Sequence, residues 1–186
     1  MTAQRADAVR NYALILAVAE EQVATHGADA SLEQIARTAG VGSATVRRHF
    51  PNRRALLEAV FSKRIDALCS HAADLADADD PRAALLDWLT ALTTYATSAR
   101  GMADALVQDG QDDADHVNAC AARLGDAVDP LLDRAARAEA VAPDVTTADL
   151  ISLVTGLALA TERHPDPEAE AHRLLALTVR GISPHG

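Results

Sequence analysis

The chain has 186 residues, of which 49% are hydrophobic and 3% aromatic, and its formal net charge is −10. A chain of this length buries roughly two-thirds of its unfolded surface, which is enough for one or two domains with hydrophobic cores. It contains no signal peptide and no run of about 20 apolar residues, so we expect a cytoplasmic protein that does not enter a membrane. The two cysteines and seven histidines show no metal-ligand spacing, and we expect neither a metal nor a cofactor.

The charge is divided unevenly along the chain. Residues 1–65 carry nine Lys and Arg against six Asp and Glu, a net charge of +3, whereas residues 66–186 carry eight against twenty-one, a net charge of −13. The overall charge argues against nucleic-acid binding. A basic segment joined to an acidic body, however, suits a protein whose basic end faces DNA while the DNA phosphates repel its acidic end. We therefore expect two domains, 1–65 and 66–186, and the abundance of Ala and Leu predicts an all-α fold.

The first helix is expected from about Ala6 to Thr25, after a loose arm over Thr2–Ala6. Apolar residues recur at helical spacing on one of its faces, at Ile15, Leu16, Ala19 and Val23. That face is expected to pack against the helices that follow.

Two short helices separated by a tight turn are predicted within Ser31–Leu57. Ser31 and Gln34 have the spacing of a capping box at the start of the first of them. Gly40 supplies the left-handed conformation that ends this helix, and Ser43 is expected to cap the next one.

The second short helix has its large apolar residues at Val46 and Phe50, four positions apart on one face. This is the pattern of a helix-turn-helix, whose second helix enters the major groove of DNA. Arginine binds guanine edges bidentately, and hydroxyls bond to bases or phosphates. The candidate DNA contacts are therefore the polar residues of this helix, Ser43, Thr45, Arg47, Arg48 and His49, although Thr45 could instead pack against or cap its own helix.

Arg53 opens the next helix, which is expected to run to about Asp77. Unpaired N–H groups at a helix N-terminus favour anions, so Arg53 is a candidate phosphate contact. An ordinary helical hairpin with a solvated basic face is the alternative. The concentration of basic residues on the shortest helix of an acidic chain favours DNA binding.

A longer pattern is formed by Ile15, Leu16, Ala19, Gly27 and the run SLEQIARTAGVGSATVRRHFPNRRALLEAV. Over about the first 60 residues it resembles the DNA-binding domain of TetR-family transcriptional regulators. The resemblance implies a homodimer on a near-palindromic operator and a small-molecule effector bound by the C-terminal domain. The family usually has a backbone-contacting tyrosine where this chain has Arg47, so Arg47 is expected at either the DNA backbone or a base. Arg53 stands where the family often has a phosphate-contacting lysine.

Another helix is expected over about Arg82–Ala99, with Asp80 as its cap and Pro81 at its first position. Its apolar stripe includes two large aromatic residues and predicts either plain core or one wall of a ligand cavity. For a cavity, the candidate lining residues are Trp88 and Tyr95 of this stripe, Asn118 further along the chain and, as the family resemblance implies, Met102 and Leu106.

A long helical stretch follows over Ala114–Ala140, in which Pro130 predicts a kink or a short break. Thr146 and Asp149 have capping-box spacing before the apolar run LISLVTGLALA, and Pro167 begins the last helix. The last two helices are apolar and lightly charged, which predicts a twofold dimer formed through them.

Together these patterns predict an all-α protein with an N-terminal three-helix helix-turn-helix domain and a C-terminal helical bundle. The expected function is transcriptional regulation, as a repressor that a small molecule releases from its operator. A DNA-binding regulator without a small-molecule effector is an alternative. An all-α enzyme is a second alternative, but no nucleophile–base pair or phosphate-binding loop supports it, so no enzymatic activity is expected.

Overall fold

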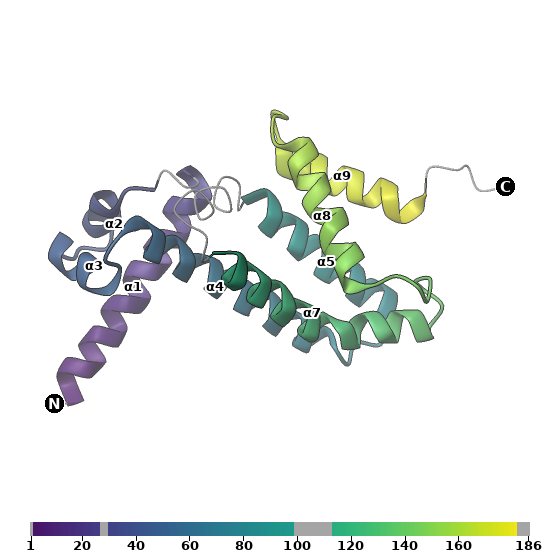
Figure 1. Ribbon diagram of the computed structural model, residues 1–186, viewed down its shortest axis with the longest axis horizontal. Helices are drawn as coiled ribbons and strands as arrows, with labels where there is room; N and C mark the ends of the chain where they lie inside the picture. The colour runs from purple at the N-terminus through teal and green to yellow at the C-terminus, as the bar shows by residue number, and fades with distance from the viewer. Residues whose placement is uncertain (1, 27–29, 99–112, 182–186) are drawn as a thin grey trace. The chain divides into compact units, whose positions relative to one another are not determined.

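A computed structural model describes the backbone of residues 2–26, 30–98 and 113–181, and the side chains of residues 6–26, 30–98 and 122–181. These residues form helices joined by turns and short loops, with no strand among them (Figure 1). The first four helices are α1 (Thr2–His26), α2 (Leu32–Thr38), α3 (Ser43–His49) and α4 (Arg53–Leu75). The later ones are α5 (Pro81–Ser98), α7 (Asp113–Arg137), α8 (Thr147–Thr161) and α9 (Pro167–Arg180). The predicted all-α fold is confirmed.

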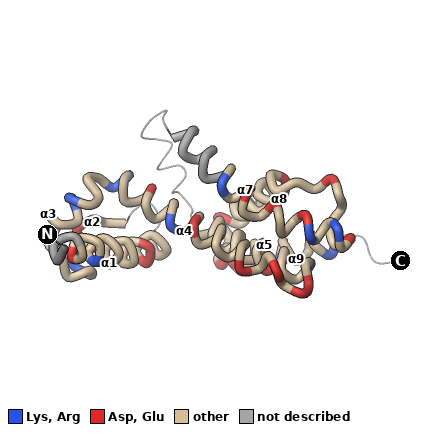
Figure 2. The backbone as a smooth tube through the Cα atoms, turned by 90° about the horizontal axis from the view of Figure 1, so that it is seen from below, with Lys and Arg blue, Asp and Glu red and all other residues tan. Residues whose placement is uncertain are grey.

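The chain divides into two compact units, and helix α4 contributes residues to both. The N-terminal unit includes Met1–Lys63, and the C-terminal unit comprises Arg64–Ser98 and Asp115–Gly186. Figure 2 shows Lys and Arg on α3 and near the start of α4, and many Asp and Glu on the helices of the C-terminal unit. The basic and the acidic parts of the sequence thus fall largely into different units.

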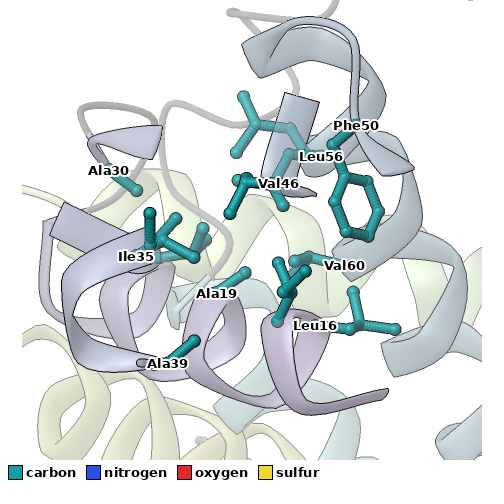
Figure 3. Packing of buried hydrophobic residues seen from close by; sticks show 13 residues of the cluster. Leu16, Ala19, Ala30, Ile35, Ala39, Val46, Phe50, Leu56 and Val60 are labelled. Atoms are coloured by element: carbon teal, nitrogen blue, oxygen red, sulfur yellow. The ribbon is translucent and has the colours of Figure 1, made fainter. Parts of the chain in front are cut away.

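The core of the N-terminal unit combines one face from each of α1, α2, α3 and α4 (Figure 3). The apolar stripe predicted on α1 is buried along its length, and Ile35, Val46 and Leu56 from the other helices meet it. The start of α1 differs from the prediction, because the helix already begins at Thr2 and no loose arm precedes Ala6. Ala, Gln and Arg are good helix formers, which explains the extension.

The turn between α2 and α3 is a glycine-terminated helix end. Gly40 has φ +66°, its N–H donates to the Arg37 carbonyl at 3.2 Å, and the Val41 N–H donates to the Ala36 carbonyl at 3.1 Å. These are the two bonds of a Schellman motif. The predicted role of Gly40 is confirmed.

The caps of α2 and α3 were predicted only in part. Ser31 accepts the Gln34 N–H at 3.4 Å, as expected, but the Gln34 side chain donates to the Thr38 hydroxyl at 3.5 Å instead of reaching back. The N-cap of α3 is Gly42, with φ −69° and ψ 144°, so the prediction that Ser43 caps this helix is wrong. Ser43 is already its first helical residue.

The C-terminal unit is held together by α5, α8 and α9, which pack on one another, and by apolar residues of α4 and α7. The predicted caps of all three packed helices are confirmed: Asp80 accepts from Arg82 and Ala83, Thr146 and Asp149 form a capping box, and Asp166 accepts from Ala169. Trp88 lies fully buried, and its indole N–H donates to the Leu68 carbonyl at 3.1 Å. This bond satisfies the one polar atom of the largest side chain in the core.

Pro130 was predicted to cause a kink or a short break, and the structure shows no break there. Helix α7 runs without interruption from Asp113 to Arg137 with Pro130 inside it. Val128, Leu131 and Leu132 are buried on either side of the proline, and Asp129 accepts a 2.5 Å hydrogen bond from the Thr147 hydroxyl. Packing of this apolar face outweighs the lost backbone hydrogen bond, which local sequence preference cannot anticipate.

Within the described ranges, no helix combines the length and the apolar character that crossing a membrane requires. Among the described side chains, no three His, Cys, Asp or Glu residues are grouped so that they would hold a metal ion.

Candidate nucleic-acid interface

Helix α3 has a single buried stripe. Val46 is 1% exposed, and Phe50, directly after the helix, is 2% exposed. Because successive residues of a helix turn by about 100°, Ala44 and Arg48, two positions to either side of Val46, point away from the core. Both are exposed. The outward surface of α3 is therefore centred on Ala44 and Arg48, with the neighbouring residues on its flanks.

Arg47 occupies the flank that faces α2. Its Nη2 atom donates to Oε1 of Glu33 at 3.1 Å, and the Ser31 hydroxyl donates to Oε2 of the same carboxylate at 3.3 Å. The Glu33 backbone N–H, then Arg47 and Ser31, hold the pKa of Glu33 below its ordinary value of 4.5. Glu33 is thus a carboxylate at neutral pH, and Arg47 is paired to it before DNA is met.

His49 occupies the opposite flank, where it lies against α1. The Tyr12 ring meets the His49 ring edge-on at 5.9 Å between centroids and stacks on Phe50 at 5.1 Å. Tyr12 is one of the few exposed large hydrophobic side chains that the structure describes. These contacts fix one side of the His49 ring to the protein, so it has less freedom than a surface histidine.

The start of α4 presents Arg53, which is exposed at the first helical position. The Asn52 side-chain oxygen caps the helix by accepting the Ala55 N–H at 2.8 Å. Arg54 instead turns along the helix, and its Nε donates to Glu58 at 2.8 Å. The two adjacent arginines thus differ in their surroundings. Arg53 lies at the helix terminus, whereas Arg54 is bound to Glu58 of the same helix.

The remaining candidates also lie on α3, where Ser43 is exposed and Thr45 is half-buried. A helix of seven residues with two arginines and two hydroxyls on its accessible sides fits a major groove about 12 Å wide. Three further residues enter the site in the structure, Ala44, Glu33 and Tyr12. The position of Ala44 two residues before Val46 was a usable signal, whereas Glu33 and Tyr12 are too distant in sequence for any spacing to have indicated them.

A second candidate site is a cavity of about 300 Å³ within the C-terminal unit. The polar side chains at its edge have partners. Arg64 donates to the Ser98 hydroxyl at 3.1 Å, and Nε2 of His71 lies 3.2 Å from Oδ2 of Asp87. Its walls come from α4 and α5, through Arg64, Ala67, Leu68, His71, Ala91, Thr94, Tyr95 and Ser98. The cavity is open to the surface and mostly apolar in its lining, and its volume lies at the lower end of the range found for small-molecule sites.

Of the five residues predicted to line a ligand cavity, Tyr95 lies on this one. Trp88 is buried in the core with its N–H bonded to Leu68, and it does not line the cavity. Met102 and Leu106 lie outside the described residues, and the side chain of Asn118 also lies outside them.

Comparisons with known proteins found a family match for each half of the chain. Residues 15–60 match bacterial regulatory proteins of the tetR family, and residues 80–184 match the C-terminal domain of SbtR-like transcriptional regulators. The second match alone covers more than half of the chain. The chain belongs to the TetR family. The resemblance found over its first 60 residues is confirmed and extends through the C-terminal unit.

Two solved TetR regulators are similar over nearly their whole length. The regulator SCO0520 from Streptomyces coelicolor is 37% identical, covers 94% of this chain and 99% of its own, and gives a TM-score of 0.74. A TetR regulatory protein from Mycobacterium vanbaalenii is 31% identical, with 97% and 99% covered and a TM-score of 0.70. The regulator FadR from Bacillus subtilis, solved in complex with stearoyl-CoA, shares the fold at 18% identity, covering 92% of this chain and all of its own, with a TM-score of 0.61. No curated protein sequence matches significantly.

Membership of the TetR family settles the general function. The chain is a transcriptional regulator with an N-terminal DNA-binding domain, and TetR regulators bind DNA and form dimers. The family is one of regulators rather than enzymes. Helix α3 is the second helix of the helix-turn-helix and is called the recognition helix below.

Proposed function

We propose that this TetR regulator is a repressor that binds a near-palindromic operator and is released from it by a small molecule. The observation that carries the proposal is the outward face of the recognition helix, where Arg48 stands opposite the buried Val46. Base and phosphate contacts come from Ser43, Thr45, Arg47, Arg48 and His49 of α3 and from Arg53 of α4.

In this proposal residues 1–65 bind DNA and residues 66–186 bind the effector and dimerise through α8 and α9. Leu159 of α8 is 67% exposed, and Gly156 has open space around it, which permits close approach of a second helix. A twofold axis between the subunits places two recognition helices about 34–36 Å or somewhat more apart, on successive major grooves of the operator.

The cavity between α4 and α5 is the proposed effector site. A ligand that binds more tightly to a form with mis-spaced recognition helices shifts the population of the protein away from DNA. The ratio of the ligand's affinities for the two forms sets how far it weakens operator binding. Regulator, operator and effector would meet in the cytoplasm.

The test of DNA recognition is selection of bound duplexes from a random pool at near-physiological salt, followed by titration of Arg48→Ala. We expect a near-palindromic consensus and a loss of about 1–3 kcal/mol of operator binding in Arg48→Ala, with the dimer intact. Arg163→Ala, which removes an exposed arginine from the C-terminal unit, is the matched control and should bind as the parent does.

An unchanged operator affinity in Arg48→Ala would refute the groove assignment. Recovery of no consensus, with weak and steeply salt-dependent binding, would mean that the basic residues touch only the DNA backbone. A thermal-shift screen of small molecules tests the effector separately, because a ligand of the folded state raises the melting temperature. If no compound stabilises the protein, a regulator without an effector becomes the better description.

A further inference from the structure

The carboxylate of Glu33 is anchored on both sides. It accepts the Ser31 hydroxyl at 3.3 Å and lies in the first turn of α2, where its own backbone N–H lowers its pKa. Its other oxygen accepts from Nη2 of Arg47 at 3.1 Å. A carboxylate fixed to the start of one helix thus holds an arginine of the next, across a gap of fourteen positions in the sequence.

The shape of a guanidinium gives this contact a direction. Arginine presents five N–H donors in a planar fork, and the bond to Glu33 uses a donor at one edge. The side chains are 62% and 58% exposed, so the pair lies at the surface of the unit. The bond favours one direction of the Arg47 side chain, so less rotamer freedom is lost when Arg47 contacts DNA from that direction.

Glu33 also places a negative charge beside the recognition helix. At an arbitrary DNA sequence, where Arg47 meets no partner suited to its direction, this charge would lie close to phosphates and would oppose binding. At the operator the oriented arginine would offset that repulsion. The same residue would therefore act with opposite sign on the two kinds of DNA.

We infer that Glu33 is a positioning residue that sets DNA specificity through Arg47. This inference rests on the proposed function, because it takes the outward side of α3 to be the side that meets the operator. The recognition surface then contains two arginines: Arg48, which faces solvent, and Arg47, whose direction is set by the carboxylate of Glu33.

The test is a double-mutant cycle of Glu33→Gln and Arg47→Ala, titrated against the operator and against a scrambled duplex of equal length. Glu33→Gln keeps a side chain of similar size and removes the charge. We expect its affinity for the operator to fall about two- to fivefold while its affinity for the scrambled duplex rises by a similar factor. With Arg47→Ala already present, Glu33→Gln should no longer lower operator affinity, because nothing remains to be oriented.

The matched control is Glu21→Gln, which removes an exposed carboxylate from α1 of the same unit. It should change both duplexes by the same small factor. If Glu33→Gln also changes both duplexes equally, or lowers operator affinity just as much when Arg47→Ala is present, the inference is wrong. Melting temperatures within a few degrees of the parent exclude a folding defect as the cause.

Failure of this inference can be told apart from failure of the proposed function. If Arg48→Ala weakens operator binding but the Glu33–Arg47 cycle shows no coupling, only the role of Glu33 is lost. If Arg48→Ala also leaves operator binding unchanged, the recognition surface itself lies elsewhere.

Discussion

Arg47 and Arg48 are adjacent in the sequence but have different surroundings in the fold. Arg48 points away from Val46 into solvent, whereas Arg47 is bound to Glu33 on the neighbouring helix. His49, the next residue, is packed against Tyr12. A run of three basic residues therefore provides one solvent-facing cation, one oriented cation and one ring held by aromatic contacts.

Gly40 is the residue whose replacement tests the turn of the helix-turn-helix most directly. Its φ of +66° disfavours any residue with a side chain, although an added Cβ would meet no atom within 4 Å. We expect Gly40→Ala to destabilise the N-terminal unit by about 1–2 kcal/mol through backbone strain alone. Urea denaturation followed by circular dichroism measures this.

Gly125→Ala is the matched control, because Gly125 lies within α7 and also has open space around its Cα. There the substitution should stabilise the protein by up to about 1 kcal/mol, since alanine favours a helix. Equal effects of the two substitutions would contradict the assignment of strain to Gly40.

Among the elements, the N-terminal caps of α5, α8 and α9 were the features most predictable from sequence. Asp80, Thr146 and Asp166 cap their helices as expected, because a cap depends on a residue and the three that follow it. The first residue of α1, the N-cap residue of α3 and the absence of a break in α7 at Pro130 were not predicted. The continuity of α7 depends on packing from distant parts of the chain, which no local pattern contains.

The capping box of α8 should make stability depend on pH. The Thr146 hydroxyl, then its backbone N–H, hold the pKa of Asp149 below its ordinary value of 3.8. A carboxylate with a lowered pKa stabilises the fold above the unfolded value, and this stabilisation is lost as the pH falls through the folded value. Asp149→Asn should therefore lower the melting temperature at pH 6–7, and the difference should shrink as the pH falls below about 3.8.

Asp144→Asn, in the exposed loop before α8, is the control for the loss of a carboxylate as such. Its melting temperature should follow that of the parent across the same pH range. A difference between Asp149→Asn and the parent that stays constant down to pH 3 would show that the cap does not act through ionisation.

For the whole molecule, the sequence predicted the all-α class and the family, because the helix-turn-helix pattern is local and the charge division is visible in the composition. Of the cavity between α4 and α5, the sequence predicted only Tyr95. The cavity combines Arg64 and His71 of α4 with Thr94 and Tyr95 of α5, and only the fold brings these residues together. The Glu33–Arg47 pair was not predicted either, because only the fold brings these two residues together.

Dimerisation through α8 and α9 is testable at Leu159. Among the described residues of the C-terminal unit it is the one large hydrophobic side chain that is strongly exposed. In a packed apolar interface a carboxylate at this position would be buried without a partner, so we expect Leu159→Glu to shift the dimer toward monomer in analytical ultracentrifugation. Operator affinity should fall with it, since a monomer contacts only one half-site.

Ala83→Glu, an equal change of charge at an exposed position of α5, should leave the dimer intact. A dimer that withstands Leu159→Glu would place the subunit contact on another surface.

The division of the chain inside α4 has a consequence for how such proteins can be recombined. Lys63 and Arg64 belong to different units but are consecutive residues of one helix, so at this junction no loop separates the two units. A cut there would leave helix carbonyls unpaired and would separate the part of α4 that carries the buried Ile65 and Leu68 from the first part of the helix. A chimera with the body of another regulator must therefore be spliced helix to helix, with the 3.6-residue phase of the apolar stripe preserved across the junction.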